Sequence, residues 1–338
     1  MVNVFVTICG NIPVDAWLVD KIARLPGINT VDTPEASDCI FVGWTWRPEY
    51  VADPGMVTRI LRSGKPVAVF DYLECGRDTE MVLTRPANWN SALEPYTPLA
   101  DLEPAIKVYF KREHEPDKLP VLPYPVKATD FIGDYYPGYD EPVRPEAFAQ
   151  RPINVFMFYG FSSYDRMMFH AELLRKHAHP TKVWMTPEDV QWAVDRGEKE
   201  IYALLYTPAH RRYPITDILR LQNMAKFSVC LRGASEKCFR HAESAYNSIM
   251  ALQETTTQFA YPWSNRLNCL TLPNLPKSTI TPLCHLDVAK AATALNVALG
   301  DDLYPIYLAG FLNSKRYIAE NYIRDYWVPL LRQHGVWP

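Results

Sequence analysis

The chain has 338 residues and a mass of 38.8 kDa, a length typical of two domains of about 100–200 residues each. Hydrophobic residues make up 48% of the sequence and charged residues 22%, which excludes a disordered or low-complexity protein. The net charge of -3 and an isoelectric point near 6.3 argue against a protein whose main task is to coat nucleic acid or an anionic membrane.

Residues 1–10 form a short apolar run without a basic leader, and no later stretch reaches about 20 uncharged apolar residues, the length of a membrane span. The seven cysteines are scattered and include no C-x-x-C pair, a pattern that favours reduced thiols over a disulfide framework or a zinc cluster. We therefore expect a cytoplasmic protein without integral membrane association.

The first 125 residues alternate short β-branched runs with helical patterns, as expected for an open α/β sheet. The nearly continuous apolar character of residues 66–70 is typical of a buried parallel strand. The pattern predicts strands at 2–8, 39–44, 66–70 and 105–110, and helices at 15–25 and 56–62.

A second α/β unit begins at residue 153, after a stretch rich in Pro and Tyr that lacks hydrophobic periodicity. Its predicted strands are 153–158, 201–206 and 227–231, and its predicted helices run through Met167 to Leu174 and over 216–226, 285–297 and 301–332. The sequence thus predicts an α/β protein with two Rossmann-like domains that face a central cleft. The expected parts are residues 1–128, a connection at 129–152, a second domain at 153–315, and a C-terminal helix at 316–338 that packs back toward the first domain.

Residues 227–254 are the most informative segment, with a predicted strand, a loop at 232–235 and a helix from near Glu236. Arg232 and Gly233 stand just before this helix, where guanidinium and free N–H groups can hold a diphosphate. Helical spacing brings together Lys237, Arg240, Glu243 and Ser244. Glu243 would accept hydrogen bonds from a ribose, so the segment predicts a nucleotide site.

Taken singly, these features have simpler explanations. Arg240 and Glu243 can form a solvated ion pair on the helix surface. Arg232 and Gly233 can form only a tight turn.

Two further groups of residues are candidates for ligand contact. The turn at 159–163 connects a strand to a helix through small residues, as in phosphate-binding folds. Its candidate donor contacts are Gly160, Ser162, Ser163 and Arg166, for which a helix cap and a surface arginine are the alternatives. Lys111 and Arg112, at a predicted strand end, can contact phosphate or acceptor, or form a solvated charge run.

The segment Cys230-Leu231-Arg232-Gly233, followed after six residues by Arg240-His241-Ala242-Glu243, is similar to the donor-binding segment of exostosin-like glycosyltransferases of the two-domain GT-B fold. The resemblance implies that Arg232 and Arg240 face the donor phosphates and that Glu243 meets the nucleotide sugar. Leu231 replaces the usual Pro of the family, and residues 247–249 replace its Gly-x-x-Pro. The resemblance makes 1–128 the acceptor domain and 153–315 the donor domain.

The resemblance further implies a hexosyl- or pentosyltransferase that moves a sugar from a nucleoside-diphosphate sugar, a UDP-sugar first of all, to a hydroxyl acceptor. The chain contains no D-x-D carboxylate pair, so we expect no metal and no cofactor, with fixed positive charge on the leaving group. Exostosin-like enzymes of the secretory pathway carry a membrane anchor. Its absence here favours a bacterial or viral enzyme, in the host cytoplasm if viral.

We expect the acceptor to be a glycan or a hydroxymethylated DNA base. Aromatic loops with Trp44, Trp46 and Trp89 can stack on an extruded base, whereas the acidic net charge favours the glycan.

Inverting transfer requires a general base near the acceptor hydroxyl. Asp71, directly after the predicted strand 66–70, is the first candidate, and His114 and Asp15 are the alternatives. A retaining mechanism needs no such base, and each of the three residues can instead be a cap or a surface group.

Two rival functions fit the same architecture. An NAD-dependent oxidoreductase would use two α/β halves, but no G-x-G-x-x-G follows any predicted strand. A non-catalytic two-domain protein that closes on a small molecule or nucleotide is the second rival.

Overall fold

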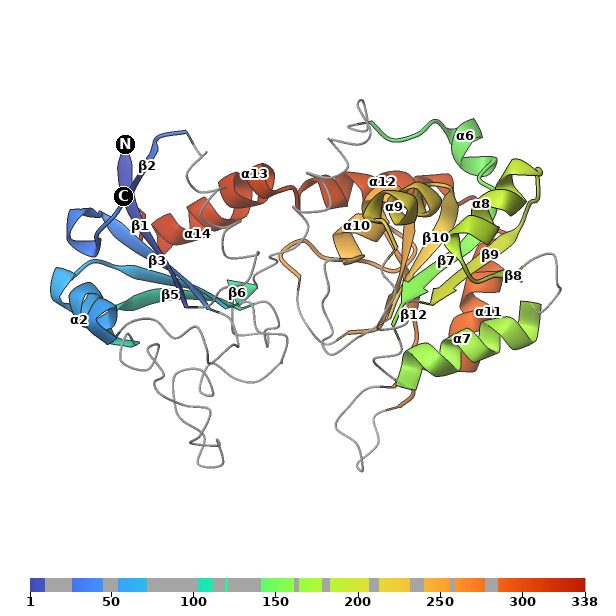
Figure 1. Cartoon of the computed structure of the whole chain (residues 1–338), viewed down its shortest axis with the longest axis horizontal. Helices are drawn as coiled ribbons and strands as arrows, with labels where there is room; N and C mark the ends of the chain where they lie inside the picture. The colour runs from blue at the N-terminus through green and yellow to red at the C-terminus, as the bar shows by residue number, and fades with distance from the viewer. Residues whose placement is uncertain are drawn as a thin grey trace. The chain divides into compact units, whose positions relative to one another are not determined.

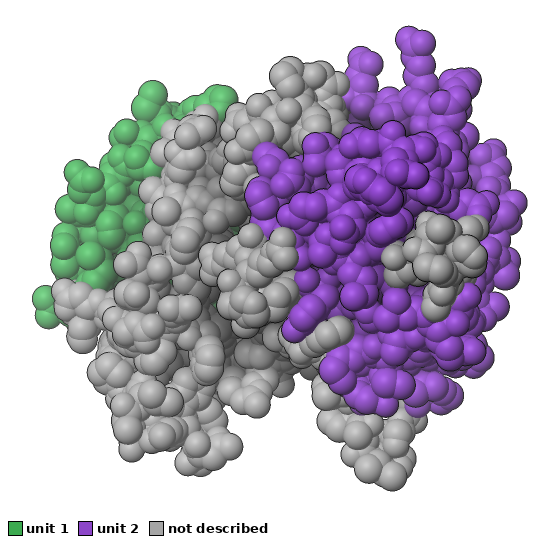
Figure 2. All heavy atoms as spheres, turned by 45° about the vertical axis from the view of Figure 1, so that its right-hand side comes forward, with its two compact units in different colours: residues 1–124, 257–260, 319–338 green, residues 125–256, 261–318 purple. Residues whose placement is uncertain are grey.

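The computed structural model describes residues 1–9, 26–44, 54–71, 103–111, 119–120, 141–160, 164–177, 183–206, 213–231, 240–255, 259–276 and 285–337. The chain forms two compact units, coloured separately in Figure 2. Unit 1 comprises residues 1–124, 257–260 and 319–338, and unit 2 comprises residues 125–256 and 261–318.

Unit 1 is built on a six-stranded parallel sheet with the strand order β2-β1-β3-β4-β5-β6 (Figure 1). The strands are β1 (Val2–Cys9), β2 (Ile28–Val31), β3 (Cys39–Trp44), β4 (Val67–Asp71), β5 (Ile106–Lys111) and β6 (Leu119–Pro120). Its described helical segments before residue 124 are η1 (Pro34–Ala36), α2 (Pro54–Ser63) and η4 (Glu103–Ala105).

Both faces of this sheet are covered, which explains the continuous apolar runs of its strands. Ile40, Val42 and Val69 pack with Ile60 of α2 on one face. Because side chains alternate along a strand, Phe70 points to the other face, where its ring lies 4.7 Å from that of Trp327. Trp327 belongs to the C-terminal segment, which consists of α13 (Ala319–Tyr322), a π-helical turn η5 (Ile323–Trp327) and α14 (Val328–Gln333).

Unit 2 is built on a second six-stranded parallel sheet, with the order β12-β11-β10-β7-β9-β8. The strands are β7 (Ile153–Tyr159), β8 (Val183–Trp184), β9 (Ile201–Tyr206), β10 (Ala225–Cys230), β11 (Ile249–Gln253) and β12 (Leu270–Leu272). Its described helices are α6 (Pro145–Ala149), α7 (Tyr164–His177), α8 (Pro187–Asp195), α9 (Ile215–Asn223), α10 (Arg240–Asn247), α11 (Val288–Ala298) and α12 (Tyr304–Lys315).

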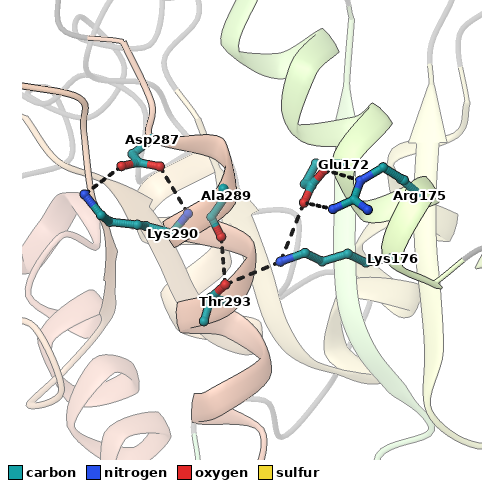
Figure 3. A network of polar contacts seen from close by, with 7 residues as sticks. All are labelled: Glu172, Arg175, Lys176, Asp287, Ala289, Lys290 and Thr293. Carbon is teal, nitrogen blue, oxygen red and sulfur yellow. Dashed lines mark hydrogen bonds and ion pairs between the residues drawn. The ribbon is translucent and has the colours of Figure 1, made fainter.

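Helices α7 and α11 cover one face of the second sheet, whereas α8 and α9 cover the other. Polar contacts at the surface link α7 and α11 (Figure 3): Lys176 Nζ donates to Thr293 Oγ1 at 3.4 Å. Glu172 accepts from Arg175 within α7, and Asp287 caps the first turn of α11 by accepting from the Lys290 N–H at 3.1 Å. Such exposed contacts add only a few tenths of a kcal/mol each, so α7 is held in place by its buried face.

Two parallel α/β sheets confirm the prediction of two Rossmann-like domains. The predicted helix 216–226 is wrong at its end, because α9 ends at Asn223 and Ala225 already belongs to β10. The Ala225 carbonyl accepts a hydrogen bond from Arg151 Nη1 at 2.7 Å instead of continuing the helix. Strands β11 and β12 and helix α8 were not predicted.

Residues 141–152, which the sequence placed in the interdomain connection, pack within unit 2. Phe148 of α6 is 2% exposed, and its ring stacks on Tyr307 at 4.6 Å. Arg151 is also buried, and its guanidinium lies over both of these rings. The apolar contacts of α6 hold this stretch against the second sheet. The Pro-rich composition of the stretch gives no sign of these contacts.

Among the described helices, none combines the length and the apolar character needed to cross a membrane.

Candidate functional site

The strand order of unit 2 changes direction between β7 and β10. The chain leaves β7 toward β9 and β8, and it leaves β10 toward β11 and β12. In open parallel sheets, ligands bind outside the carboxyl ends of the strands at such a switch point. Tyr159 and Cys230 end the two strands concerned, so this edge is the expected location of a ligand site.

A small pocket of about 10 Å³, room for about one water molecule, lies at this point of the sheet. It is lined by residues 157–159 of β7, residues 229–231 at the end of β10, and Arg166 of α7. The pocket therefore lies at the ends of the two strands that directly precede the segments indicated by the sequence, the turn after residue 159 and the loop from Arg232.

Arg166 connects the two strand ends. Its Nη2 donates to the carbonyl oxygen of Leu231 at 3.1 Å, and its Nη1 donates to that of Gly160 at 3.4 Å. Hydrogen bonds from a charged donor are stronger than neutral ones. Arg166 therefore holds the ends of β7 and β10 together.

Helix α10 is anchored beneath the site by polar contacts. Ser244 Oγ accepts hydrogen bonds from Gln222 Nε2 at 2.9 Å and from Cys230 Sγ at 3.1 Å. Ser244 is 1% exposed, and its hydroxyl fixes α10 against β10 and α9.

Glu243 is 3% exposed in the first turn of α10. This burial does not fit the alternative of a solvated surface ion pair. A buried carboxylate is retained where hydrogen bonds or charges compensate its loss of water. The neighbouring Arg240 begins the same helix.

The described residues include only part of the predicted donor site. Gly160, Arg166 and Glu243 lie at or beside the carboxyl edge of the second sheet. The remaining predicted donor contacts, Ser162, Ser163, Arg232, Gly233 and Lys237, lie outside the described residues.

In unit 1, two of the predicted site residues lie at the carboxyl ends of neighbouring strands. Asp71 ends β4 and Lys111 ends β5, and the two are register partners on neighbouring parallel strands. Trp44 of β3 is the partner of Asp71 on the other side. Asp15, Arg112 and His114 fall outside the described residues.

A second polar cluster at the carboxyl edge of unit 2 was missed by the sequence analysis. Asp165, in the first turn of α7, is 3% exposed. Its Oδ1 lies 3.1 Å from His285 Nδ1, and its Oδ2 accepts from Gln253 Nε2 at 2.9 Å. In the sequence, Asp165 stands out only as an acidic residue in the first turn of a helix that follows a strand. Its partners Gln253 and His285 are 88 and 120 residues away.

Within the part of the chain that the structure describes, no group of three or more His, Cys, Asp or Glu side chains is placed to hold a metal ion. Burial raises the pKa of the Cys269 thiol to about 11 and that of the Cys39 thiol to about 12. These two thiols are therefore protonated at neutral pH and unsuited to act as nucleophiles.

No protein-family model and no curated protein matches the chain. Several solved structures are similar to it at low identity. A UDP-forming α,α-trehalose-phosphate synthase from Burkholderia xenovorans has 15% identity and a TM-score of 0.46, over 90% of this chain and 75% of that chain.

Anabaena HepE in complex with UDP and glucose has 9% identity and a TM-score of 0.46, over 97% of this chain and 100% of that chain. The UDP-GlcNAc 2-epimerase from Neisseria meningitidis bound to UDP-GlcNAc has 10% identity and a TM-score of 0.43, over 98% of this chain and 100% of that chain. The residues of this chain, rather than these likenesses, carry the functional proposal.

Proposed function

We propose that the chain is a GT-B glycosyltransferase that moves a sugar from a nucleoside-diphosphate sugar, a UDP-sugar first of all, to a hydroxyl acceptor. The supporting observation is the switch point of the second sheet, where Arg166 joins the end of β7 to the carbonyl of Leu231. The residue after Leu231 opens the segment 232–243, whose arginines and glutamate resemble an exostosin-like donor site.

Unit 2 would bind the donor. Arg232, Lys237 and Arg240 would neutralise the diphosphate, together with backbone N–H groups near Gly233 and at the start of α10. Ser162 and Ser163 would add hydroxyl contacts at the start of α7. Because these charges are fixed in place, they would stabilise the leaving nucleoside diphosphate without a metal ion.

The enclosed carboxylate of Glu243 would accept hydrogen bonds from the ribose. Its burial supports this role, because a carboxylate shielded from water forms stronger hydrogen bonds with a ligand hydroxyl than a solvated one does.

Unit 1 would bind the acceptor. Asp71 is the proposed general base of an inverting transfer, with His114 and Asp15 as the alternatives. Lys111, its register partner, and Arg112 would hold acceptor or phosphate. The proposed acceptor is a glycan, and a hydroxymethylated DNA base is the second choice.

Release of nucleoside diphosphate from a panel of UDP-, GDP- and ADP-sugars tests this function, because glycosyltransferases hydrolyse their donor slowly when no acceptor is present. We expect release from one or a few of these donors. Glu243→Gln and Arg240→Ala should lower the rate at least tenfold. The matched controls Glu146→Gln and Arg220→Ala, at exposed helical positions of unit 2, should leave it unchanged.

Nucleotide binding without turnover of any donor, with acceptors present, would favour the non-catalytic binding protein. Absence of both binding and turnover would overturn the proposal.

A further inference from the structure

A chain of hydrogen bonds at the carboxyl edge of unit 2 begins at Glu254. The backbone N–H of Asn274 donates to Glu254 Oε2 at 2.8 Å, and Asn274 Nδ2 donates to the Glu254 carbonyl at 2.9 Å. The side-chain amide of Asn274 is thereby oriented with its nitrogen toward Glu254. Its oxygen, Oδ1, faces Gln253, whose Nε2 donates to it at 3.0 Å.

Gln253 connects Asn274 to Asp165 through its side-chain amide nitrogen. An amide nitrogen has two N–H groups, and those of Gln253 have the acceptors Asn274 Oδ1 and Asp165 Oδ2. Oδ2 of Asp165 is therefore already engaged. The other oxygen, Oδ1, is the partner of His285 Nδ1 at 3.1 Å.

This arrangement selects one tautomer of the neutral histidine. An ionised carboxylate only accepts hydrogen bonds, so Nδ1 of His285 must carry the proton. Nε2 then keeps its lone pair and is an acceptor. The Nδ1 edge faces Asp165, which is 3% exposed, whereas the side chain of His285 as a whole is 37% exposed. The imidazole is therefore fixed at Nδ1 and still partly accessible from outside the cluster.

His285 contacts Asp165, the residue next to a residue that lines the pocket. Asp165, which holds it, directly precedes Arg166 of the pocket wall. Gln253 ends β11, the strand next to β10 at the same edge of the sheet. Tyr164 flanks the imidazole, with its ring edge-on at 6.3 Å.

We propose that His285 Nε2 accepts a hydrogen bond from a hydroxyl group of the nucleotide sugar bound at this edge, and that Asp165 is the positioning residue that fixes its tautomer. The inference rests on the proposed donor site of unit 2. The hydroxyl belongs to the ribose or to the transferred sugar, and ligands that lack one or the other distinguish the two.

Asp165→Asn provides a sharp test, because the wild-type contacts dictate how the new amide is oriented. Gln253 Nε2 donates to the position of Oδ2, so the oxygen of the new amide takes this place. Its nitrogen then faces His285 Nδ1 and donates to it. The imidazole proton moves to Nε2, which changes from acceptor to donor while the shape of the site is kept.

The tautomer can be read from the ¹⁵N chemical shifts of the imidazole at alkaline pH, where the ring is neutral. The signals of His285 are assigned by their loss in His285→Gln. We expect the Nδ1–H tautomer in the wild-type protein and the Nε2–H tautomer in Asp165→Asn. An Nε2–H tautomer in the wild-type protein would overturn the proposal, even if Asp165→Asn failed to fold.

The affinity of UDP and of the UDP-sugar that binds most tightly provides the second measurement. Loss of one hydrogen bond to the ligand predicts about tenfold weaker binding for Asp165→Asn and for His285→Gln. Asp217→Asn, at an exposed first-turn aspartate of α9, and His334→Gln, at an exposed position, serve as matched controls.

Ligand variants identify the hydroxyl. If it belongs to the ribose, deoxyribose UDP analogues bind the wild-type protein weakly, and His285→Gln weakens them no further. If it belongs to the sugar, UDP binds all variants equally and only the UDP-sugar distinguishes them. Equal affinities of wild-type protein and both variants for UDP and for the UDP-sugar would overturn the inference while leaving the donor site intact. Failure of the wild-type protein to bind any nucleotide would instead refute the proposed function.

Discussion

The Nη2 of Arg166 donates to the carbonyl oxygen of Leu231 at 3.1 Å, across 65 residues of sequence. Through this bond, a side chain in the first turn of α7 holds the end of β10, directly before Arg232. A second bond to Gly160 at 3.4 Å holds the end of β7. One guanidinium thus joins the carboxyl ends of β7 and β10.

Arg166→Gln should loosen both loops, because a glutamine side chain is shorter and lacks the fork of N–H groups that reaches two carbonyls. We expect UDP affinity to fall at least tenfold, with a loss of about 1–2 kcal/mol in the free energy of unfolding. Titration calorimetry and urea denaturation measure the two effects. The exposed Arg220→Gln serves as the control, and unchanged UDP affinity in Arg166→Gln would show that the bridge does not organise the site.

Arg151 should matter for stability rather than for ligand binding. It is 6% exposed, and its Nη1 donates to the carbonyls of Ala225 and Asn247, each at 2.7 Å. Arg151→Met keeps much of the volume but leaves these acceptors without their donor, so we expect a loss of about 2–5 kcal/mol. Urea denaturation measures it, and a loss below 1 kcal/mol would contradict the structural role.

Gly310 marks a close approach of α12 to a neighbouring loop. A Cβ at this position would lie 2.7 Å from the backbone carbonyl oxygen of Asn268. Gly310→Ala should therefore destabilise unit 2 by about 1–3 kcal/mol, although alanine normally favours a helix. At Gly300 the new Cβ would meet its nearest atom at 3.4 Å, so Gly300→Ala should cost much less. Equal unfolding midpoints of the two variants would contradict the packing of α12.

His170 should make stability depend on pH. Burial lowers its pKa below the ordinary value of 6.5, so between its lowered pKa and 6.5 the unfolded chain binds more protons than the folded one. Stability from this residue is therefore complete above 6.5 and falls as the pH is lowered through that window. Urea midpoints measured across the window should fall less steeply in His170→Gln. An identical slope in the two proteins would show that His170 does not contribute.

Much of the architecture is visible in the sequence, because strands buried on both faces are continuous apolar runs. Residues 201–206 were predicted with the bounds that the structure shows. Helix α9 was extended too far because Met224, Ala225 and Lys226 are good helix formers. Ala225 instead pairs with Ile153 of β7 and accepts a hydrogen bond from Arg151, contacts that lie far away along the chain. Strand β11 was missed because its five residues come almost directly after α10, without a turn signal that separates a strand from the helix.

The candidate site is predictable only where its residues are close in sequence. The segment 230–243 combines strand, turn and helix signals within a few residues, so it can be recognised locally. The contact of Asp165 with His285 spans 120 residues and depends on how α7 packs beside β11 and β12. Local patterns contain no information on such a pairing.

Hydrogen–deuterium exchange with and without UDP tests the central claim most directly, because it locates the nucleotide on the chain. We predict that UDP slows exchange in residues 157–166 and 229–247, at the carboxyl ends of β7 and β10, and leaves β8 and α8 at residues 183–195 unchanged. Binding of UDP that protects neither of the first two segments would contradict the donor site proposed for unit 2.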